Sequence, residues 1–397
     1  MNLKKILAVG LGLIGLLVVG LIVAGWILVR PWVAMPEGVD PVAVEARFQE
    51  LSAQYATAFD PAGKDNRDVW KLSAKAGPAF EAVLGDRPLF RGGCDRDVGE
   101  AEVIYRSNRA ELSPMATAYH ELMADGLVLG DYRFYLEEGE EDPDVDIPNF
   151  VGLRYLFMAS MIDARHALAD GDTEAAMQRM DDASQAVAGL ADSRELLVSM
   201  MSIAFQHIWY EVLAETMSLW PSAELAHIEA LLQSEPSHKE SARRALERAV
   251  IFSVENLHLD NLEHFRDDRY YAPEAQVVGR LASGPAKGLL AAWLERERTL
   301  ILAWTFEGID AAGDGREWEP AKRYPDTKSV LASIMLPNAG SLIGKGMESD
   351  QANAAMLQAL RNERAYRYGE GSPEFVVPFG DGGAVEVKRD GGCVRWN

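Results

Sequence analysis

The chain has 397 residues, of which 61 are acidic and 39 are basic, so its formal net charge is −22. Its hydrophobic share of 48% is typical of globular proteins and excludes an intrinsically disordered chain. The charge is uneven: residues 1–30 hold three basic side chains and no acid, residues 31–315 hold 25 basic and 50 acidic ones, and residues 316–397 hold 11 of each. Because an acidic body repels polyanions, we expect no nucleic-acid partner and favour a cationic protein surface or divalent ions.

A long apolar run near the N-terminus predicts a membrane anchor. The segment Ile6–Val29 contains no charged side chain. As a helix this run would extend about 36 Å, enough to cross bilayer hydrocarbon of about 30 Å. A cleaved signal peptide is the alternative, but its apolar region is normally shorter, and Arg30-Pro31-Trp32 makes a poor cleavage site. We therefore expect residues 1–30 to remain on the protein as an uncleaved signal anchor.

The basic residues around this run predict its orientation. Lys4 and Lys5 precede it, and positive charge is favoured on the cytoplasmic side of a membrane. The expected protein therefore crosses the cell (inner) membrane once, with its N-terminus in the cytoplasm and residues 31–397 in the periplasm or another extracytoplasmic space. Small residues four apart in the run, such as Ala8 and Gly12, would let two anchors approach closely, which leaves a homodimer open.

The sequence contains two cysteines, Cys94 and Cys393, each preceded by two glycines. Thiols outside the cytoplasm tend to oxidise, so we expect a disulfide between them. That bond would close a loop of about 300 residues and hold the C-terminal segment on the rest of the chain. Two unrelated thiols are the alternative. A metal site would need more ligands than this pair supplies.

Helical periodicity begins at Pro41, where Val44, Phe48, Leu51 and Tyr55 fall on one face. The next expected helices cover 68–84 and 100–123, with a new helix starting at Ser113-Pro114 because proline suits a first helical turn.

A strongly acidic stretch, residues 137–146, follows these helices. So many like charges cannot be buried together, which predicts an exposed loop. The glycine and final glutamate of a calcium-binding EF-hand loop are not at the required positions. Whether this loop binds an ion stays open.

Residues 149–190 predict a helical hairpin. Apolar residues repeat at helical spacing on both sides of a break at Asp170-Gly171-Asp172. The expected inward residues are Phe150, Leu153, Phe157, Met161 and Ala164 before the break, and Ala176, Met180, Ala183 and Val187 after it. The turn and the small residues of 167–176 resemble a tetratricopeptide unit. Because no second copy follows at a fixed period, the resemblance implies only helical-hairpin packing.

Residues 195–220 are apolar almost all round, which could indicate a second membrane span. Gln206, His207 and Glu211 lie inside this stretch, and a charge in the middle of a membrane is costly. We therefore predict a buried central helix.

The later helices are marked by capping residues. Ser222 is expected to cap a short helix ending at Gln233, and the box 237–240 is expected to open a longer helix to about Arg266. His264 continues the inward stripe of that helix, which predicts a buried, hydrogen-bonded histidine. A further helix is expected from Pro273 to about Phe306, with a break at Gly284-Pro285.

Glycine and proline become frequent from residue 313 onward. We expect one helix over Asp350–Tyr366, followed by short strands near 375–377, 384–388 and 394–396 that form a small meander. This helix and its strands resemble the C-terminal module of uncharacterised bacterial membrane-anchored helical proteins. The resemblance implies no known chemistry.

Two Glu-x-x-His pairs, Glu224–His227 and Glu255–His258, are the candidate metal ligands. Each pair would share one helix face, as in di-iron carboxylate bundles, but exposed polar pairs are far more common. The segment 340–346 resembles a phosphate-binding loop, although one spacer is missing and glycine replaces the magnesium-binding hydroxyl residue. We therefore expect no cofactor, no metal and no catalytic residues.

Together these features predict a mainly α protein with one transmembrane helix, a body of antiparallel helical hairpins forming an irregular bundle or short solenoid, and a small C-terminal α+β module. The predicted parts are an anchor (1–30), a juxtamembrane linker (31–40), an acidic helical domain (41–312) and the C-terminal module (313–397). The leading functional hypothesis is a non-enzymatic, membrane-tethered envelope protein that binds another protein or helps assemble a complex. The alternatives are an enzyme acting on cell-envelope material and a sensor of a cationic ligand or divalent ion.

Overall fold

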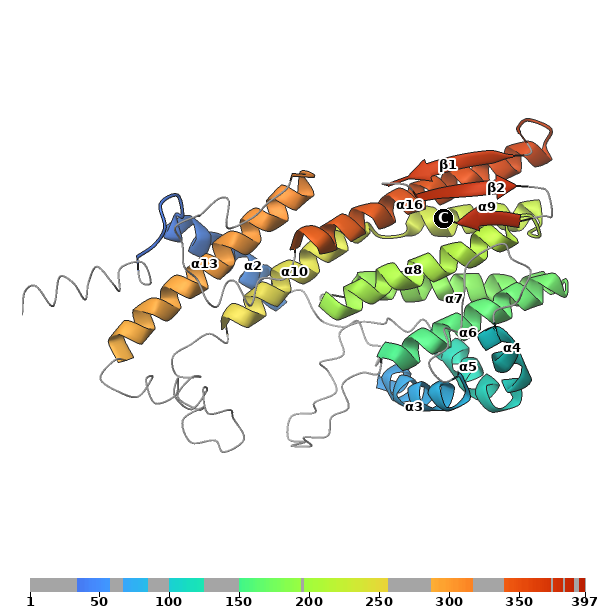
Figure 1. The fold of residues 1–397 in the computed structure, drawn as a ribbon, viewed down its shortest axis with the longest axis horizontal. Helices are drawn as coiled ribbons and strands as arrows, with labels where there is room; N and C mark the ends of the chain where they lie inside the picture. The colour runs from blue at the N-terminus through green and yellow to red at the C-terminus, as the bar shows by residue number, and fades with distance from the viewer. Residues whose placement is uncertain are drawn as a thin grey trace, which may run out of the picture. The chain divides into compact units, whose positions relative to one another are not determined.

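The structure is a computed structural model that describes residues 34–57, 67–84, 100–124, 150–193, 196–255, 287–316, 339–372, 374–380, 383–388 and 393–396. These residues form a mainly helical protein with a small C-terminal antiparallel sheet (Figure 1). Several predictions fall outside the described residues and stay predictions: the membrane run 6–29, Cys94, the acidic stretch 137–146, His258 and His264.

The chain divides into two compact units. Unit 1 contains the described residues 34–57, 250–255, 287–316 and 339–340, and unit 2 contains the described residues between 67 and 249 and from 341 onward. This grouping follows contacts between segments rather than position in the chain. The predicted division into 41–312 and 313–397 was drawn from composition and stays a prediction.

Unit 1 is built from α2 (Pro41–Thr57), α13 (Lys287–Gly313) and the last residues of α10 (His238–Glu255). The predicted apolar face of α2 is confirmed, since Phe48 is buried in the core of this unit and its helical neighbours pack against that core. The core also contains Val250, Ile251, Val254, Leu300, Ile301, Leu302, Ala303, Trp304 and Phe306.

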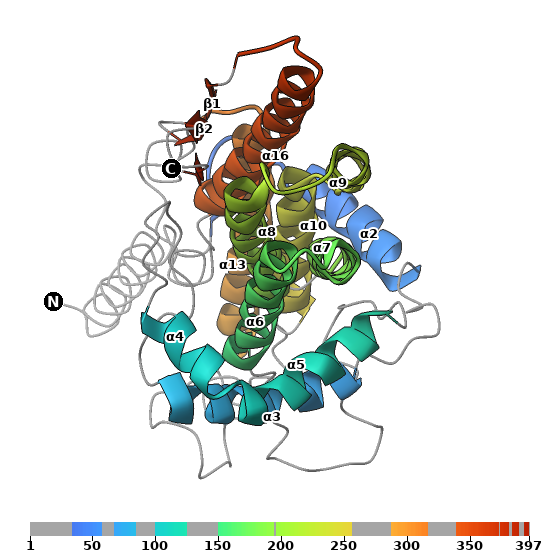
Figure 2. The same ribbon diagram turned by 90° about the vertical axis from the view of Figure 1, so that its right-hand side faces the viewer.

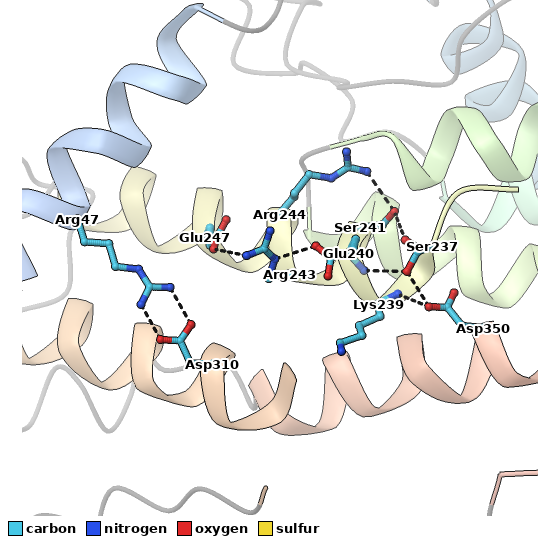
Figure 3. A network of polar contacts seen from close by, with 10 residues as sticks. All are labelled: Arg47, Ser237, Lys239, Glu240, Ser241, Arg243, Arg244, Glu247, Asp310 and Asp350. Carbon is cyan, nitrogen blue, oxygen red and sulfur yellow. Dashed lines mark hydrogen bonds and ion pairs between the residues drawn. The ribbon is translucent and has the colours of Figure 1, made fainter. Parts of the chain in front are cut away.

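Arginines join α2 to α13 in unit 1. Arg47 donates two hydrogen bonds to Asp310, at 2.7 and 2.9 Å (Figure 3). Its guanidinium also lies over the Phe306 ring, 4.5 Å from the ring centroid. Arg298 contacts Glu45 at 2.7 Å. Such bidentate and ring-stacked geometry is favourable for arginine and fixes how two helices lie along each other.

Unit 2 is the larger unit. Its helices are α3 (Arg67–Leu84), α4 (Glu100–Ser107), α5 (Arg109–Ala124), α6 (Phe150–Ala169), α7 (Thr173–Ala191), α8 (Leu196–Thr216), α9 (Ser222–Ser234), the first part of α10, and α16 (Ala339–Arg367) from Ser341 on. The helices α6, α7 and α8 follow one another through short connections and pack side by side (Figures 1 and 2). This arrangement confirms antiparallel hairpin packing for this part of the chain.

The hairpin predicted over residues 149–190 is confirmed as α6 and α7. The Asp172 side chain accepts a hydrogen bond from the Ala175 N–H at 3.1 Å and so caps α7. The predicted inward residues of both helices are buried, except that Phe150 is partly buried.

The central helix α8 is buried along most of its surface, as predicted. Within the described part of the chain, α8 is the one helix that is long and apolar enough to cross a membrane. However, 61% of its most apolar window lies inside the protein. Its buried residues include the large side chains of Phe205, Trp209 and Tyr210. Burial in the core of unit 2 therefore accounts for the apolar character of this helix.

A glycine allows α6 to cross close to α3. A Cβ atom at Gly152 would lie 1.9 Å from the Ser73 carbonyl oxygen and 2.8 Å from the Gly77 nitrogen, both of which belong to α3. No side chain fits into that space. The two helices therefore touch through their backbones at this point.

Three helix starts differ from the predictions. The break between α4 and α5 lies at Asn108, whose side chain donates to the Ile104 carbonyl at 2.9 Å, so Pro114 lies inside α5 rather than at its start. Ser222 is the first residue of α9, with Pro221 in the cap position and no side-chain cap bond. The last long helix, α16, starts at Ala339 instead of near Asp350. Its first turns are rich in glycine, and one of these glycines, Gly346, packs closely against the backbone of His238.

The predicted meander is confirmed by β1 (Phe375–Phe379), β2 (Gly383–Lys388) and β3 (Cys393–Trp396), which pair antiparallel in that order. Val385 of β2 is buried in the core of unit 2, and β3 lies against α8. The chain enters this module from α16. There, Arg367 donates to the carbonyl oxygens of Met217, Ser218 and Trp220, which fastens the end of α16 to the end of α8.

Candidate functional site

A cleft of about 340 Å³ lies between α8 and the first turns of α16, both within unit 2. The residues that line it are Met200, Ile203, Ala204 and His207 of α8 and Leu342, Lys345 and Glu348 of α16. The three residues from α16 recur every third position and therefore share one side of that helix. The cleft thus has apolar walls and carries an imidazole, an ammonium and a carboxylate.

The glycine-rich start of α16 makes this position possible. A Cβ at Gly346 would lie 2.7 Å from the His238 carbonyl oxygen, so α16 passes directly over the first residue of α10. By contrast, no heavy atom lies within 4 Å of a Cβ built at Gly344. The glycines that resembled a phosphate loop therefore lie in a helix, and one of them serves a close helix crossing.

A buried polar network lies beside the cleft and joins α8, α16 and the connection between α9 and α10. Ser349 donates to the side-chain oxygen of Gln206, whose amide nitrogen lies 3.0 Å from both the Tyr210 hydroxyl and the Glu235 carboxylate. Tyr210 also donates to the same oxygen of Glu235. Because each of these groups bonds to a group from another segment, the network fixes α16 against α8.

Asp350 of α16 caps the start of α10 (Figure 3). Its carboxylate accepts from the backbone N–H groups of His238 (2.7 Å) and Lys239 (3.3 Å) and from the Ser237 hydroxyl (2.7 Å). A carboxylate at a helix N-terminus is favourable because it satisfies orphan N–H groups and complements the helix dipole.

Of the two hydrogen bonds that a capping box at 237–240 predicts, the structure has one. The Ser237 hydroxyl accepts from the Glu240 N–H at 3.3 Å, as expected for a helix cap. The Glu240 side chain does not reach back, however, and instead pairs with Arg243 at 2.9 Å (Figure 3). Asp350, which the sequence did not point to, takes over the rest of the capping.

Burial perturbs the titratable groups around the cleft. It lowers the pKa of His207, although the Glu348 carboxylate opposes that shift, and it lowers the pKa of His238 as well. Burial also raises the pKa of Glu235 to about 7, against the hydrogen bonds from Tyr210 and Gln206, which favour its charged form. Near neutral pH the two imidazoles are therefore uncharged.

The polar groups of the cleft are the imidazole of His207 and the two charged side chains of Lys345 and Glu348. Among the described residues, burial raises the pKa of Glu211 and of Glu235 to about 7, and neither side chain lines the cleft. The cleft combines apolar walls with exposed Lys345 and Glu348 at its edge. This combination fits an apolar side chain that has polar neighbours.

A second buried polar cluster lies in the core between α5 and α7. His120 Nδ1 is 2.5 Å from an oxygen of Asp182, whose side chain is fully buried. Gln178 donates to the other oxygen of Asp182 at 3.1 Å. Burial lowers the pKa of His120 despite that hydrogen bond, and its Nε2 has no partner among the described residues. The pair joins α5 to α7 inside the core of unit 2.

The predicted metal ligands lie only partly within the described residues, so whether the two pairs come together stays untested. Glu224 and His227 lie one turn apart on α9, but the imidazole of His227 pairs with Asp181 of α7 at 2.7 Å. Glu255 ends α10 and its side chain lies outside the described part of the chain, as does His258. Within the described ranges, no group of three or more His, Cys, Asp or Glu side chains is placed to hold a metal ion.

The predicted disulfide is untested because Cys94 lies outside the described residues. Cys393 begins β3 and is paired with Lys388 of β2 through the backbone. That position places one of the two cysteines in the sheet whose last strand lies against α8.

Sequence reasoning missed the cleft. His207 stood out only as a polar residue in an apolar run, and its neighbours Lys345 and Glu348 lie more than a hundred residues later in the chain. The one usable signal was the glycine spacing near residue 346, which indicates a close approach of two backbones as readily as a phosphate loop.

Comparison with known proteins gives no family for this chain. No protein-family model matches it, and neither a curated protein nor a solved structure was found to be similar. The resemblances of the 149–190 hairpin and of the C-terminal module therefore stay predictions, and the side chains themselves must carry any functional proposal.

Proposed function

We propose that this protein is a membrane-tethered envelope protein that binds another protein through the cleft between α8 and α16 and acts as a scaffold or assembly factor rather than an enzyme. The observation that carries the proposal is the apolar side of α8 left open beside the cleft. Leu197 is 52% exposed and Met200 is 41% exposed, one helical turn apart, on a helix whose other large side chains are mostly buried.

Two apolar side chains exposed next to a cleft favour a protein ligand. Methionine is flexible and polarisable, so Met200 can adapt to different apolar partners. Lys345 and Glu348 carry opposite charges at the edge of the cleft, which matches the polar rim that surrounds the apolar centre of protein interfaces. The strongly acidic chain favours a partner whose surrounding surface is basic.

A tether supports a binding role. The uncharged run at 6–29 would confine the protein to one membrane, where a partner in the same membrane meets it at a raised effective concentration. A cleft of moderate affinity is sufficient under those conditions. A partner that is itself membrane-bound, or held at the membrane surface, is therefore favoured.

The test is site-specific photo-crosslinking of the full-length protein in its native membranes. A photoreactive amino acid at Lys345 is expected to give one discrete adduct of higher mass, whose second component is identified by mass spectrometry. The matched control places the same amino acid at Leu219, which is 55% exposed and does not line the cleft. Absence of an adduct at Lys345, or equal adducts at both positions, would overturn the proposal.

A further inference from the structure

Arg296 is a buried arginine that binds the backbone at the start of the described chain. Its side chain is 2% exposed and its neighbour Glu297 is 0% exposed, with 2.8 Å between a guanidinium nitrogen and the Glu297 carboxylate. The Arg296 Nε atom donates to the Ala34 carbonyl oxygen at 2.8 Å. A guanidinium removed from water is retained only with well-placed partners, so this bond fixes the backbone of residue 34 on α13.

The residues after Ala34 are also fastened to unit 1. Met35 and Val39 pack against its apolar core. The Asp40 carboxylate accepts from the Val42 N–H at 3.0 Å and thereby caps α2. Most of the stretch predicted as a juxtamembrane linker, from residue 34 onward, is therefore docked on unit 1 instead of forming a free tether.

Chain length then limits how far unit 1 can be from the lipid. Five residue steps separate Val29, the last residue of the apolar run, from Ala34. A fully extended chain covers at most about 3.3–3.6 Å per residue, so these steps span no more than about 18 Å. With the apolar run in a bilayer, the body of unit 1 has to lie next to the outer lipid headgroups.

Charge does not supply this proximity. The described residues of unit 1 include five basic and ten acidic side chains, so the unit is not attracted to anionic lipid. Attachment through the chain supplies it instead. The distance from the membrane should therefore depend on the docked linker and hardly at all on salt or on lipid charge.

We propose that unit 1 is a membrane-proximal mount, in which buried Arg296 fastens the juxtamembrane backbone to α13 and holds the α2–α13 core against the outer lipid surface. This inference rests on the membrane anchoring in the proposed function and adds the part of the protein that faces the lipid. It is independent of whether the cleft binds a protein.

The test uses the full-length protein in phosphatidylcholine nanodiscs, with a fluorescent amino acid at Glu295 of α13 and acceptor dyes on lipid headgroups. Glu295 is suitable because its side chain is 69% exposed and lies next to Arg296 in the chain. A comparison variant carries about 20 inserted Gly and Ser residues between Trp32 and Val33, which add roughly 25 Å of flexible tether. Energy transfer is expected to be high in the parent and to fall at least about two-fold in the variant.

The outcomes separate this inference from the anchor. Unchanged transfer in 0.5 M salt and in discs with anionic lipid supports a geometric mount, whereas loss of transfer in salt overturns it. Equal transfer in the parent and the insertion variant, with both retained in the discs, overturns the mount and leaves the anchor standing. If the protein does not enter the discs at all, the anchor and the mount are both wrong.

Discussion

Each of the two compact units of this protein is stabilised internally by a different kind of contact. In unit 2, the helices α6, α7 and α8 follow one another through short connections and bury large apolar side chains. In unit 1, α2 and α13 lie far apart in the chain, and Arg47 and Arg298 join residues 263 and 253 positions apart beside a smaller apolar core. Closing so long a loop costs entropy, which the arginine contacts and the apolar core together have to offset.

The largest expected effect is in unit 1. Replacing Arg296 with Met removes the guanidinium that pairs with the fully buried Glu297 and breaks the hydrogen bond to the Ala34 carbonyl. Breaking one side of a buried ion pair typically destabilises a protein by about 3–5 kcal/mol. We expect a loss of that size in the free energy of unfolding, measured by urea titration followed by circular dichroism.

The double variant Arg296→Met/Glu297→Leu is the matched control. It removes both charges, so it should recover most of the lost stability because no uncompensated charge stays buried. A loss below about 1 kcal/mol for the single variant, or an equal loss for both variants, would show that unit 1 does not depend on this pair.

This contrast explains what could be predicted from sequence. Apolar periodicity acts over a few residues, so the α6–α7 hairpin, the buried stripe of α2 and the C-terminal meander all followed from local pattern. The bond from Arg296 to Ala34 and the cap that Asp350 provides to α10 join segments more than a hundred residues apart. No local pattern encodes such pairs, and the same separation concealed the cleft between α8 and α16.

The second effect compares two glycines on α16 in unit 2. Gly346→Ala would place a methyl group 2.7 Å from the His238 carbonyl oxygen, so α16 must move away from α10. Overpacking of this kind costs about 1–3 kcal/mol. Gly344→Ala meets nothing within 4 Å and should stabilise the helix by roughly 0.5–1 kcal/mol.

Urea unfolding of the two alanine variants gives the measurement. The free energy of unfolding is expected to fall for Gly346→Ala and to rise for Gly344→Ala. Because both changes raise helix propensity equally, the difference reports the close approach of α16 to α10 at Gly346. If both variants gain stability, α16 does not approach α10 through Gly346, and the position of α16 beside the cleft would be wrong.

The third effect concerns pH and the polar network beside the cleft. The pKa of Glu235 is raised from 4.5 to about 7, so the folded protein binds this proton more tightly than the unfolded chain does. Its stabilising contribution is therefore complete below about pH 4.5 and is lost as the pH rises through about 7. Glu235→Gln, which stays neutral, should make the melting temperature fall less between pH 5 and pH 8 than it does in the parent.

Glu370→Gln serves as the control for this pH experiment because Glu370 is exposed. The slope should be reduced and not abolished, since burial also raises the pKa of Glu211 to about 7 and that group is retained in the variant. A parent and a Glu235→Gln variant with the same pH dependence would mean that this carboxyl group is solvated and that the network is open to water.

The smallest effect on stability is expected for a substitution in the cleft. This substitution is also the one that tests the proposed function most directly. Met200 is 41% exposed, so Met200→Glu should change the free energy of unfolding by no more than about 0.5 kcal/mol. The same change places a charge among apolar walls and should reduce the photo-adduct at Lys345 at least ten-fold. Leu219→Glu, at a similarly exposed apolar position, should leave both quantities unchanged.

This pair of measurements distinguishes a residue that stabilises the fold from one that contacts a partner. If Met200 stabilised the fold, its replacement would lower both the free energy of unfolding and the yield of adduct. A stable Met200→Glu protein that still forms the adduct would remove the cleft from the proposed binding surface. The proposal that unit 1 lies at the membrane does not depend on this result.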